Sequence, residues 1–203
     1  MVVTFSNQYG SGAVAISARV AELLGCELVD RQLPVVVAKR LRISPETVEA
    51  SEDTLPSLGE RLLSGLELAT PELAESSAGA PFDGEVLSAV EDAVREYAQR
   101  GDAVIVGRGA GAILGPRPDL LRVFLHAPRA WRIERTIEAT GADRKSVEAE
   151  VDRVDRARAE YLRERYGLTF GDPRNYDLCL DASRFDADAC AGLIGAAARA
   201  RRA

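Results

Sequence analysis

Short apolar runs alternate along the chain with longer stretches in which apolar residues recur every three or four positions. The short runs are rich in β-branched and aromatic residues, which is typical of β-strands. They occupy residues 2–5, 26–30, 103–106, 122–125 and 176–180. Their near-continuous hydrophobicity indicates strands that are covered on both faces, as in a parallel sheet.

Helical periodicity is clearest at residues 13–24, where Ile16 and Val20 belong to the apolar stripe and Gly25 marks the end. The same pattern and its start signals predict further helices at residues 34–41, from Ser44 onward, at 84–100, 128–140 and 144–165, and after Asp186. Between residues 51 and 84, prolines and glycines interrupt the pattern. This stretch is predicted to be a mobile helical insertion rather than a linker between domains.

The alternation of strands and helices predicts an α/β protein with three layers, a mostly parallel sheet and helices on both faces. A chain of 203 residues fits a single domain over residues 1–203, because one core can grow to about 250 residues. In such sheets, ligands bind beyond the carboxyl ends of the strands. We therefore expect functional residues in the turns that follow Phe5, Leu28, Val106 and Leu125.

Composition narrows the expected partners and compartment. The formal net charge of −6 argues against non-specific binding to nucleic acid, which needs a basic face. The longest apolar runs fall short of the ~18 residues that a membrane span requires, and the N-terminus shows no secretory pattern. The three cysteines lack C-x-x-C spacing, which favours buried free thiols in a reducing compartment. The sequence predicts a cytoplasmic protein with neither a nucleic-acid nor a membrane partner.

A glycine-rich turn, Gln-Tyr-Gly-Ser-Gly at residues 8–12, joins the first predicted strand to the first predicted helix. Such a turn directs main-chain N–H groups and a helix N-terminus toward an anion, which favours phosphate. Gly10, Ser11 and Gly12 are therefore candidate phosphate ligands. A plain strand-to-helix turn is the alternative explanation of the same residues.

The lysine of the usual phosphate-binding loop is missing. That motif reads G-x-x-x-x-G-K followed by Ser or Thr, and its lysine reaches the β and γ phosphates while its hydroxyl contacts magnesium. We expect Ala15 at the lysine position and Ser17 at the hydroxyl position, which makes Ser17 the candidate magnesium ligand. The only lysines of the chain, Lys39 and Lys145, lie far from the turn in the sequence.

Several segments, in the same order along the chain, resemble cytidylate kinase-like proteins, in which the loop lysine is commonly absent as well. They are residues 6–12 with 29–31, 104–110, 123–128 with 132–135, 154–161, and 171–178. The resemblance implies a P-loop kinase fold, ATP and Mg²⁺ as cofactors, and transfer of the γ-phosphoryl group to cytidylate or a related small acceptor. Residues 51–84, which the resemblance does not cover, would form an insertion on the acceptor side.

The resemblance also implies roles for individual residues. Arg108 lies where relatives hold the acceptor nucleotide, although Gly111 stands where they often carry an aspartate. Asp30 would contact the acceptor, or it could simply cap the next helix. Arg132 and Arg135 would flank the lid and the adenine side of the donor site, or either could be an ordinary charge on a helix surface.

An arginine-dense stretch at residues 144–165 resembles the lid that covers the transferred phosphates in monophosphate kinases. By this resemblance Arg158, Arg156 and Arg153 are candidate catalytic residues, because guanidinium groups stabilise charge on phosphoryl oxygens. Acidic residues alternate with these arginines at helical distances, which is also the pattern of a solvated helix with surface ion pairs.

Three functions remain open at this point. The chain could be a cytidylate kinase-like enzyme, or a kinase for a different small acceptor whose specificity is set by residues 51–84. It could also be a nucleotide-binding regulatory protein with impaired catalysis, which the missing loop lysine and Gly111 would favour.

Overall fold

The computed structural model describes residues 1–29, 36–37 and 82–202. Several sequence predictions lie outside these residues. They are the site residue Asp30, most of the helix at 34–41, the helix from Ser44, and nearly all of the insertion at 51–84.

In the part of the chain that the structure describes, five parallel strands form one sheet in the order β2-β3-β1-β4-β5, which confirms the predicted α/β class. The strands are β1 Val2–Asn7, β2 Glu27–Val29, β3 Ala103–Val106, β4 Leu120–His126 and β5 Leu178–Asp181. In the central pairings, Val2 lies opposite Ala103 of β3 and Leu120 of β4. The carboxyl end of β1 is therefore flanked by the carboxyl ends of both neighbouring strands.

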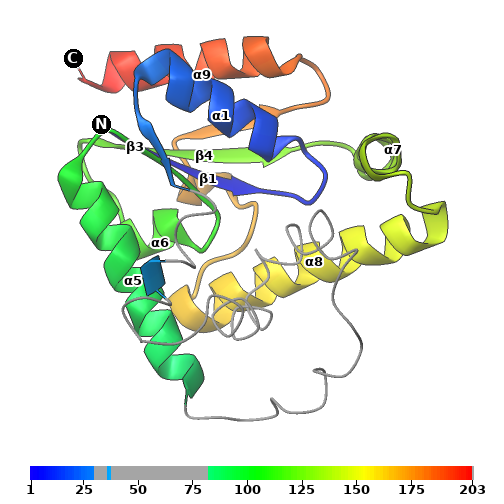
Figure 1. The fold of residues 1–203 in the computed structure, drawn as a ribbon, viewed down its shortest axis with the longest axis horizontal. Helices are drawn as coiled ribbons and strands as arrows, with labels where there is room; N and C mark the ends of the chain where they lie inside the picture. Colours follow the sequence, from blue (N-terminus) through cyan, green and yellow to red (C-terminus); the bar gives the residue numbers. More distant parts are fainter. Residues whose placement is uncertain (30–35, 38–81, 203) are drawn as a thin grey trace.

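Helices cover both faces of this sheet (Figure 1). One face carries α1 (Ala13–Leu24) and α9 (Ala187–Arg202), and the other carries α5 (Phe82–Arg100) and α6 (Ala110–Leu114). The long helix α8 (Arg144–Tyr166) runs beneath the same face as α5, while α7 (Arg129–Thr140) lies beyond the carboxyl edge of the strands. This edge is the place where loops from several strands converge.

Successive side chains of each strand point alternately into two apolar layers. Val3 and Phe5 of β1 pack with α1 and α9, whereas Val2 belongs to the cluster under α5. Because both faces are covered by helices, most side chains of β1, β3 and β4 are buried. This burial explains the near-continuous apolar runs in the sequence.

Two short elements differ from the sequence prediction. The helix α6 has five residues, which is too short for a periodic signal to emerge. A 3-10 turn at Pro173–Asn175 precedes β5, and β5 begins at Leu178 rather than at residue 176. The ring of Tyr176 instead stacks on Phe124, with 4.8 Å between the ring centroids.

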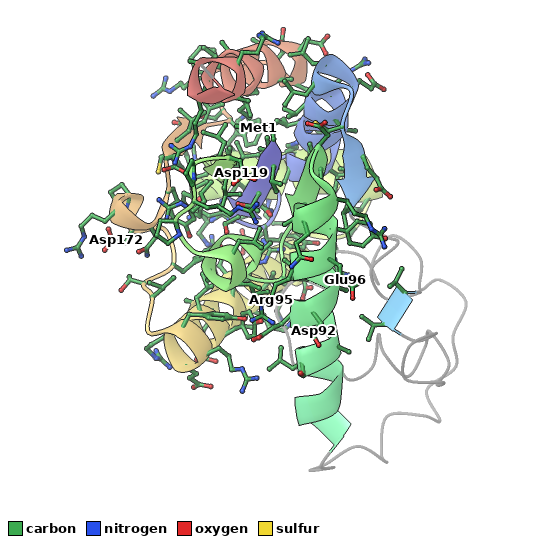
Figure 2. All side chains as sticks on the ribbon, turned by 90° about the vertical axis from the view of Figure 1, so that its left-hand side faces the viewer. Met1, Asp92, Arg95, Glu96, Asp119 and Asp172 are labelled. Atoms are coloured by element: carbon green, nitrogen blue, oxygen red, sulfur yellow. The ribbon has the colours of Figure 1, made fainter. Side chains whose placement is uncertain are left out.

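Polar contacts hold the amino edge of the sheet, opposite the loops described below. The Met1 amino group lies 3.0 Å from the Asp102 carboxylate, and Val2 N donates to Asp119 O at 2.8 Å. Figure 2 shows Met1 and Asp119 in the same region of the molecule. Asp92 and Arg95 of α5 lie lower in this view. Within the described part of the chain, no helix has the length and apolar character to cross a membrane.

Candidate active site

The glycine-rich turn of the sequence follows β1, at the centre of the carboxyl edge. Ser11 N donates to Gln8 O at 3.2 Å, which closes the turn. Gly10 and Gly12 have φ angles of 75° and 85°, a left-handed conformation that glycine adopts without steric cost. Gly12 is the N-cap of α1, and no side chain caps the helix. The N–H groups of the first helical turn are therefore available to an anion.

Gly10 is also required by packing. A methyl group at this position would lie 2.7 Å from Thr136 Oγ1 and 2.9 Å from the main-chain oxygen of Arg132. Both atoms belong to α7, so the turn lies directly against that helix. Only glycine fits this contact and this backbone conformation together.

An ion pair between α7 and α8 clamps the turn at Tyr9. Asp155 Oδ1 accepts from Tyr9 N at 2.8 Å, and Arg132 Nη1 donates to Tyr9 O at 2.7 Å. Arg132 Nη1 also lies 2.9 Å from Asp155 Oδ2, and Arg132 Nε donates to Ala127 O at 3.0 Å. Arg132 is 4% exposed, so its charge is neutralised inside the protein. In this structure it supports the loop, whereas the sequence prediction placed it among the cofactor ligands.

The three candidate catalytic arginines of α8 occupy different environments. Arg158 is buried, and its Nη1 donates to the main-chain oxygen of Asn7 at 2.6 Å. Arg153 is exposed and donates to both carboxylate oxygens of Glu150, at 2.6 and 2.7 Å. Arg156 is exposed as well. Arg158 is thus joined to the end of β1, while Arg153 takes part in a surface ion pair of the kind that the charge pattern indicated.

Arg108 lies at the carboxyl end of β3, as the sequence predicted, and is 4% exposed. Its φ angle of 54° is unusual for a residue other than glycine. Together with Arg158, Ser6, Tyr161 and Phe170 it lines a cavity of about 30 Å³. Two buried guanidinium groups at one small cavity favour an anionic group such as a phosphate.

A second cavity, of about 290 Å³, shares Ser6 and Leu162 with the first and is also lined by Gly111, Arg122 and Tyr176. Gly111, the position at which the resemblance implied an aspartate in relatives, packs closely against β1. A methyl group built there would lie 3.2 Å from Thr4 Oγ1, so a larger side chain would require Thr4 to shift slightly. The glycine therefore has a packing role between α6 and β1.

A hydrogen-bonded chain of side chains joins the end of α8 to α5. The Tyr161 and Tyr166 hydroxyls lie 3.2 Å apart, and Tyr166 donates to Glu91 at 3.1 Å. Burial is the main cause that raises the pKa of Tyr166, and the bond with Tyr161 adds to it. The phenol therefore stays protonated and continues to donate.

The position of the missing lysine in the motif differs from the sequence interpretation. Because Gly12 directly precedes the first residue of α1, the motif spacing assigns its lysine to Ala13 and its hydroxyl to Val14. The sequence interpretation had placed these positions at Ala15 and Ser17. Ser17 is 1% exposed, and its hydroxyl donates to Val14 O at 3.2 Å. This hydroxyl is turned into the helix rather than toward the loop.

The loop instead presents another hydroxyl. Ser11 is 1% exposed, and its Oγ has no hydrogen-bond partner among the described residues. Buried hydroxyls without a partner are costly and uncommon, and a phosphate oxygen would satisfy this one. Among the described residues, no group of three or more Asp, Glu, His or Cys could hold a metal ion. Magnesium in kinase sites is commonly held by one or two carboxylates and the substrate phosphates.

Sequence reasoning missed the clamp residue Asp155 as part of the site. Its signal was present, since Asp155 and Arg158 are three residues apart and so share one face of a helix. Gln8 belonged to the predicted turn, but its side-chain role was not predicted: its Oε1 accepts from Ala127 N at 3.2 Å and ties the turn to the end of β4. Local spacing indicated the shared helix face of Asp155 and Arg158, but not these contacts, because each contact joins distant parts of the chain.

A family model described as the cytidylate kinase-like family matches residues 2–184. The chain belongs to the cytidylate kinase-like family. Among curated proteins, this cytidylate kinase-like chain is 30% identical over 207 residues to a cytidylate kinase of Natronomonas pharaonis, covering 98% of this chain and 90% of that protein. A cytidylate kinase of Methanopyrus kandleri is 28% identical over 134 residues, covering 62% of this chain and 69% of the relative.

Solved structures share the fold of this chain. An uncharacterized protein from Eubacterium ventriosum superposes with a TM-score of 0.68 at 19% identity, with 98% of each chain covered. The shikimate kinase of Bacteroides thetaiotaomicron superposes with a TM-score of 0.53 at 11% identity, again with 98% of each chain covered. The family is one of kinase-like nucleotide phosphotransferases, and the fold agrees with it.

Proposed function

We propose that this protein transfers the γ-phosphoryl group of ATP to a nucleoside monophosphate, with cytidylate as the first candidate. The observation that carries the proposal is the buried hydroxyl of Ser11, which has no hydrogen-bond partner among the described residues. It lies in a glycine-rich turn at a helix N-terminus that no described side chain caps. A phosphate group is the ligand that such a turn favours. The family match and two relatives named cytidylate kinase support the choice of acceptor.

The donor phosphates would lie against the turn. The main-chain amides of the turn and of the first helical turn would hold them, together with Ser11 Oγ. Arg132, Asp155 and Arg158 would keep the turn in one conformation through their bonds to Tyr9 and Asn7. Magnesium would be held largely by phosphate oxygens, and it would neutralise charge on the transferred group.

The acceptor phosphate would lie near Arg108, in the small cavity at the ends of β1 and β3. An oxygen of this phosphate forms the new bond to the γ-phosphorus while the bond to the diphosphate leaving group breaks. This chemistry needs positioning and charge stabilisation rather than a nucleophilic side chain. The second guanidinium at this cavity, Arg158, would neutralise repulsion between the two phosphate groups.

A second candidate function is nucleotide binding without transfer. It is favoured by Ala13, which occupies the position of the loop lysine and brings no positive charge. A regulatory or scaffold protein could retain the phosphate turn and lose the chemistry. Binding and turnover must therefore be measured separately.

The deciding experiment follows phosphoryl transfer from Mg-ATP to a panel of CMP, dCMP, UMP, AMP and GMP. Formation of the nucleoside diphosphate is measured directly, and ATP binding is measured by calorimetry on the same protein. Turnover that is highest with CMP is the expected result. Binding of ATP with no transfer to any acceptor would favour the regulatory function, and transfer only to another monophosphate would replace cytidylate as the substrate.

A further inference from the structure

The phosphate turn lacks an ammonium group, yet a guanidinium group lies beside it. A methyl group built on Gly12 would be 3.1 Å from Arg135 Nη2, 3.2 Å from Nε and 3.3 Å from Cζ. Three atoms of one guanidinium at nearly equal distance place the plane of that group over Gly12. Arg135 therefore approaches the N-terminus of α1 from α7.

The charge environment of Arg135 differs from that of the other arginines on α7. Arg129 pairs with Asp152, and Arg132 pairs with Asp155. Within the described part of the chain, no carboxylate forms an ion pair with Arg135. The Arg135 guanidinium instead lies over the ring of Trp131, with 5.4 Å between Cζ and the ring centroid.

This placement is electrostatically unfavourable without a ligand. A helix N-terminus carries a partial positive charge, and Arg135 adds a full positive charge next to it. An anion between the two would interact favourably with both. The buried, partnerless hydroxyl of Ser11 in the same turn points independently to a missing polar ligand.

We propose that Arg135 supplies the positive charge that the loop lysine provides in other P-loop proteins. The inference rests on the proposed function, because it takes a polyphosphate as the ligand of the turn. The guanidinium binds phosphate oxygens through its paired N–H donors. Trp131 restricts the side chain by a cation–π contact, so that less conformational freedom is lost on binding. Arg135 thus acts on the phosphates and not on the nucleoside.

The test measures the affinity of the full-length protein for ATP, inorganic tripolyphosphate and adenosine. Arg135→Ala is compared with wild type and with Arg129→Ala, an exposed arginine of the same helix that pairs with Asp152. We expect Arg135→Ala to weaken ATP and tripolyphosphate alike, by about ten- to hundredfold, as for the loss of a charged hydrogen bond. Adenosine binding should not change, and Arg129→Ala should bind all three ligands as wild type does.

Two further variants sharpen the result. Arg135→Lys should retain part of the tripolyphosphate affinity, because the charge remains while the paired donors are lost. Trp131→Ala should cost less affinity than Arg135→Ala, because it removes only the restraint on the guanidinium. Thermal unfolding of each variant checks that the exposed substitutions leave the fold intact.

Other outcomes overturn the inference. If Arg135→Ala weakens ATP but leaves tripolyphosphate unchanged, Arg135 contacts the base or sugar, and the proposed function survives. If both ligands bind Arg135→Ala as tightly as wild type, Arg135 has no part in the site. If wild type binds neither ATP nor tripolyphosphate, the proposed function fails together with the inference.

Discussion

Individual arginine side chains in this protein have two roles, support of the phosphate turn and placement where a phosphate group would bind. Arg132 and Arg158 are buried and donate to main-chain oxygens of Tyr9 and Asn7. Buried charges persist only when they are paired and hydrogen-bonded, and here the bonds fix the backbone of the phosphate turn. Arg135 lies at the turn and Arg108 at the small cavity, which Arg158 also lines, and a phosphate group would meet them there.

The backbone of Gly10 gives the first prediction. Gly10→Ala should lower the free energy of unfolding by about 1–3 kcal/mol, because it strains a left-handed residue and drives a methyl group into α7. It should also weaken ATP binding, because the turn must shift away from Thr136. Urea unfolding and calorimetry measure the two effects.

Gly141→Ala is the matched control for this variant. Gly141 has a φ angle of 70°, and a methyl group built there meets nothing within 4 Å. This control carries the backbone strain without the clash, so it should cost less stability and leave ATP affinity unchanged. Equal losses for the two variants would show that the contact with α7 is unimportant.

Arg108 gives a prediction on the acceptor side. Arg108→Ala should raise the KM for the monophosphate by about tenfold or more while changing the KM for ATP little, since it removes a charged contact to one phosphate only. Arg163→Ala, a surface substitution at a side chain with 67% exposure, serves as the control. An unchanged acceptor KM, or an effect confined to ATP, would remove Arg108 from the acceptor site.

At the level of elements, α7 and α8 form the support on which the turn rests. Val147, Val151 and Val154 of α8 pack in one cluster with Tyr9 and Ile133. Beside this buried stripe, α8 carries surface ion pairs such as that of Arg153 with Glu150. The segment predicted as a lid is therefore, in this structure, a continuous helix with a buried stripe, and its role over the phosphates stays a prediction.

Local patterns were sufficient to predict these helices but not their contacts. The helix predicted at residues 144–165 agrees to within one residue with α8, Arg144–Tyr166. The bond from Tyr9 to Asp155 joins residues 146 positions apart, and no local pattern encodes it. The register of the missing lysine was misplaced for a different reason. The start of the helix at residue 13 was predicted correctly, but the motif spacing, in which the lysine directly follows the second glycine, was not applied to Gly12.

The ion pair between α7 and α8 that clamps the turn at Tyr9 gives a prediction about how these helices support the turn. Asp155→Asn leaves the buried charge of Arg132 without its carboxylate, so the free energy of unfolding should fall by about 2–4 kcal/mol. ATP affinity should fall as well, because the neutral amide accepts more weakly from Tyr9 N and no longer pairs with Arg132. Denaturant unfolding and calorimetry report both quantities.

Asp152→Asn is the control on the same helix. Asp152 is 51% exposed and pairs with the exposed Arg129, and such surface pairs contribute little to stability. Its removal should therefore leave both quantities near wild type. If Asp155→Asn behaved like Asp152→Asn, the ion pair would not be what holds the turn.

For the whole molecule, the order of the strands decides where the site lies. With β1 at the centre of the sheet, the turn after it is flanked by residues that follow β3 and β4. The apolar runs predicted the parallel sheet and its two helical layers, because coverage on both faces leaves a clear composition signal. They could not predict the strand order, which depends on packing between segments far apart in the sequence.

Substitutions in the hydrophobic core should lower stability without changing the ATP affinity of the candidate site. Ile194 is fully buried between α9 and the sheet, so Ile194→Ala should cost about 2–5 kcal/mol of unfolding free energy. The folded protein should keep its affinity for ATP, because α9 contributes no residue to the turn or its clamp. Leu193→Ala, at a neighbouring residue with 45% exposure, should change neither property, and weakened ATP binding by folded Ile194→Ala would contradict this separation.

Titration of the ¹⁵N-labelled protein with Mg-ATP, followed by amide resonances, tests the central claim most directly. We predict that the amides of Gly10, Ser11 and Gly12 shift together and saturate at a single dissociation constant, and that tripolyphosphate moves the same resonances. Shifts confined to other parts of the chain, with these three amides unmoved at saturation, would contradict a phosphate site at the turn.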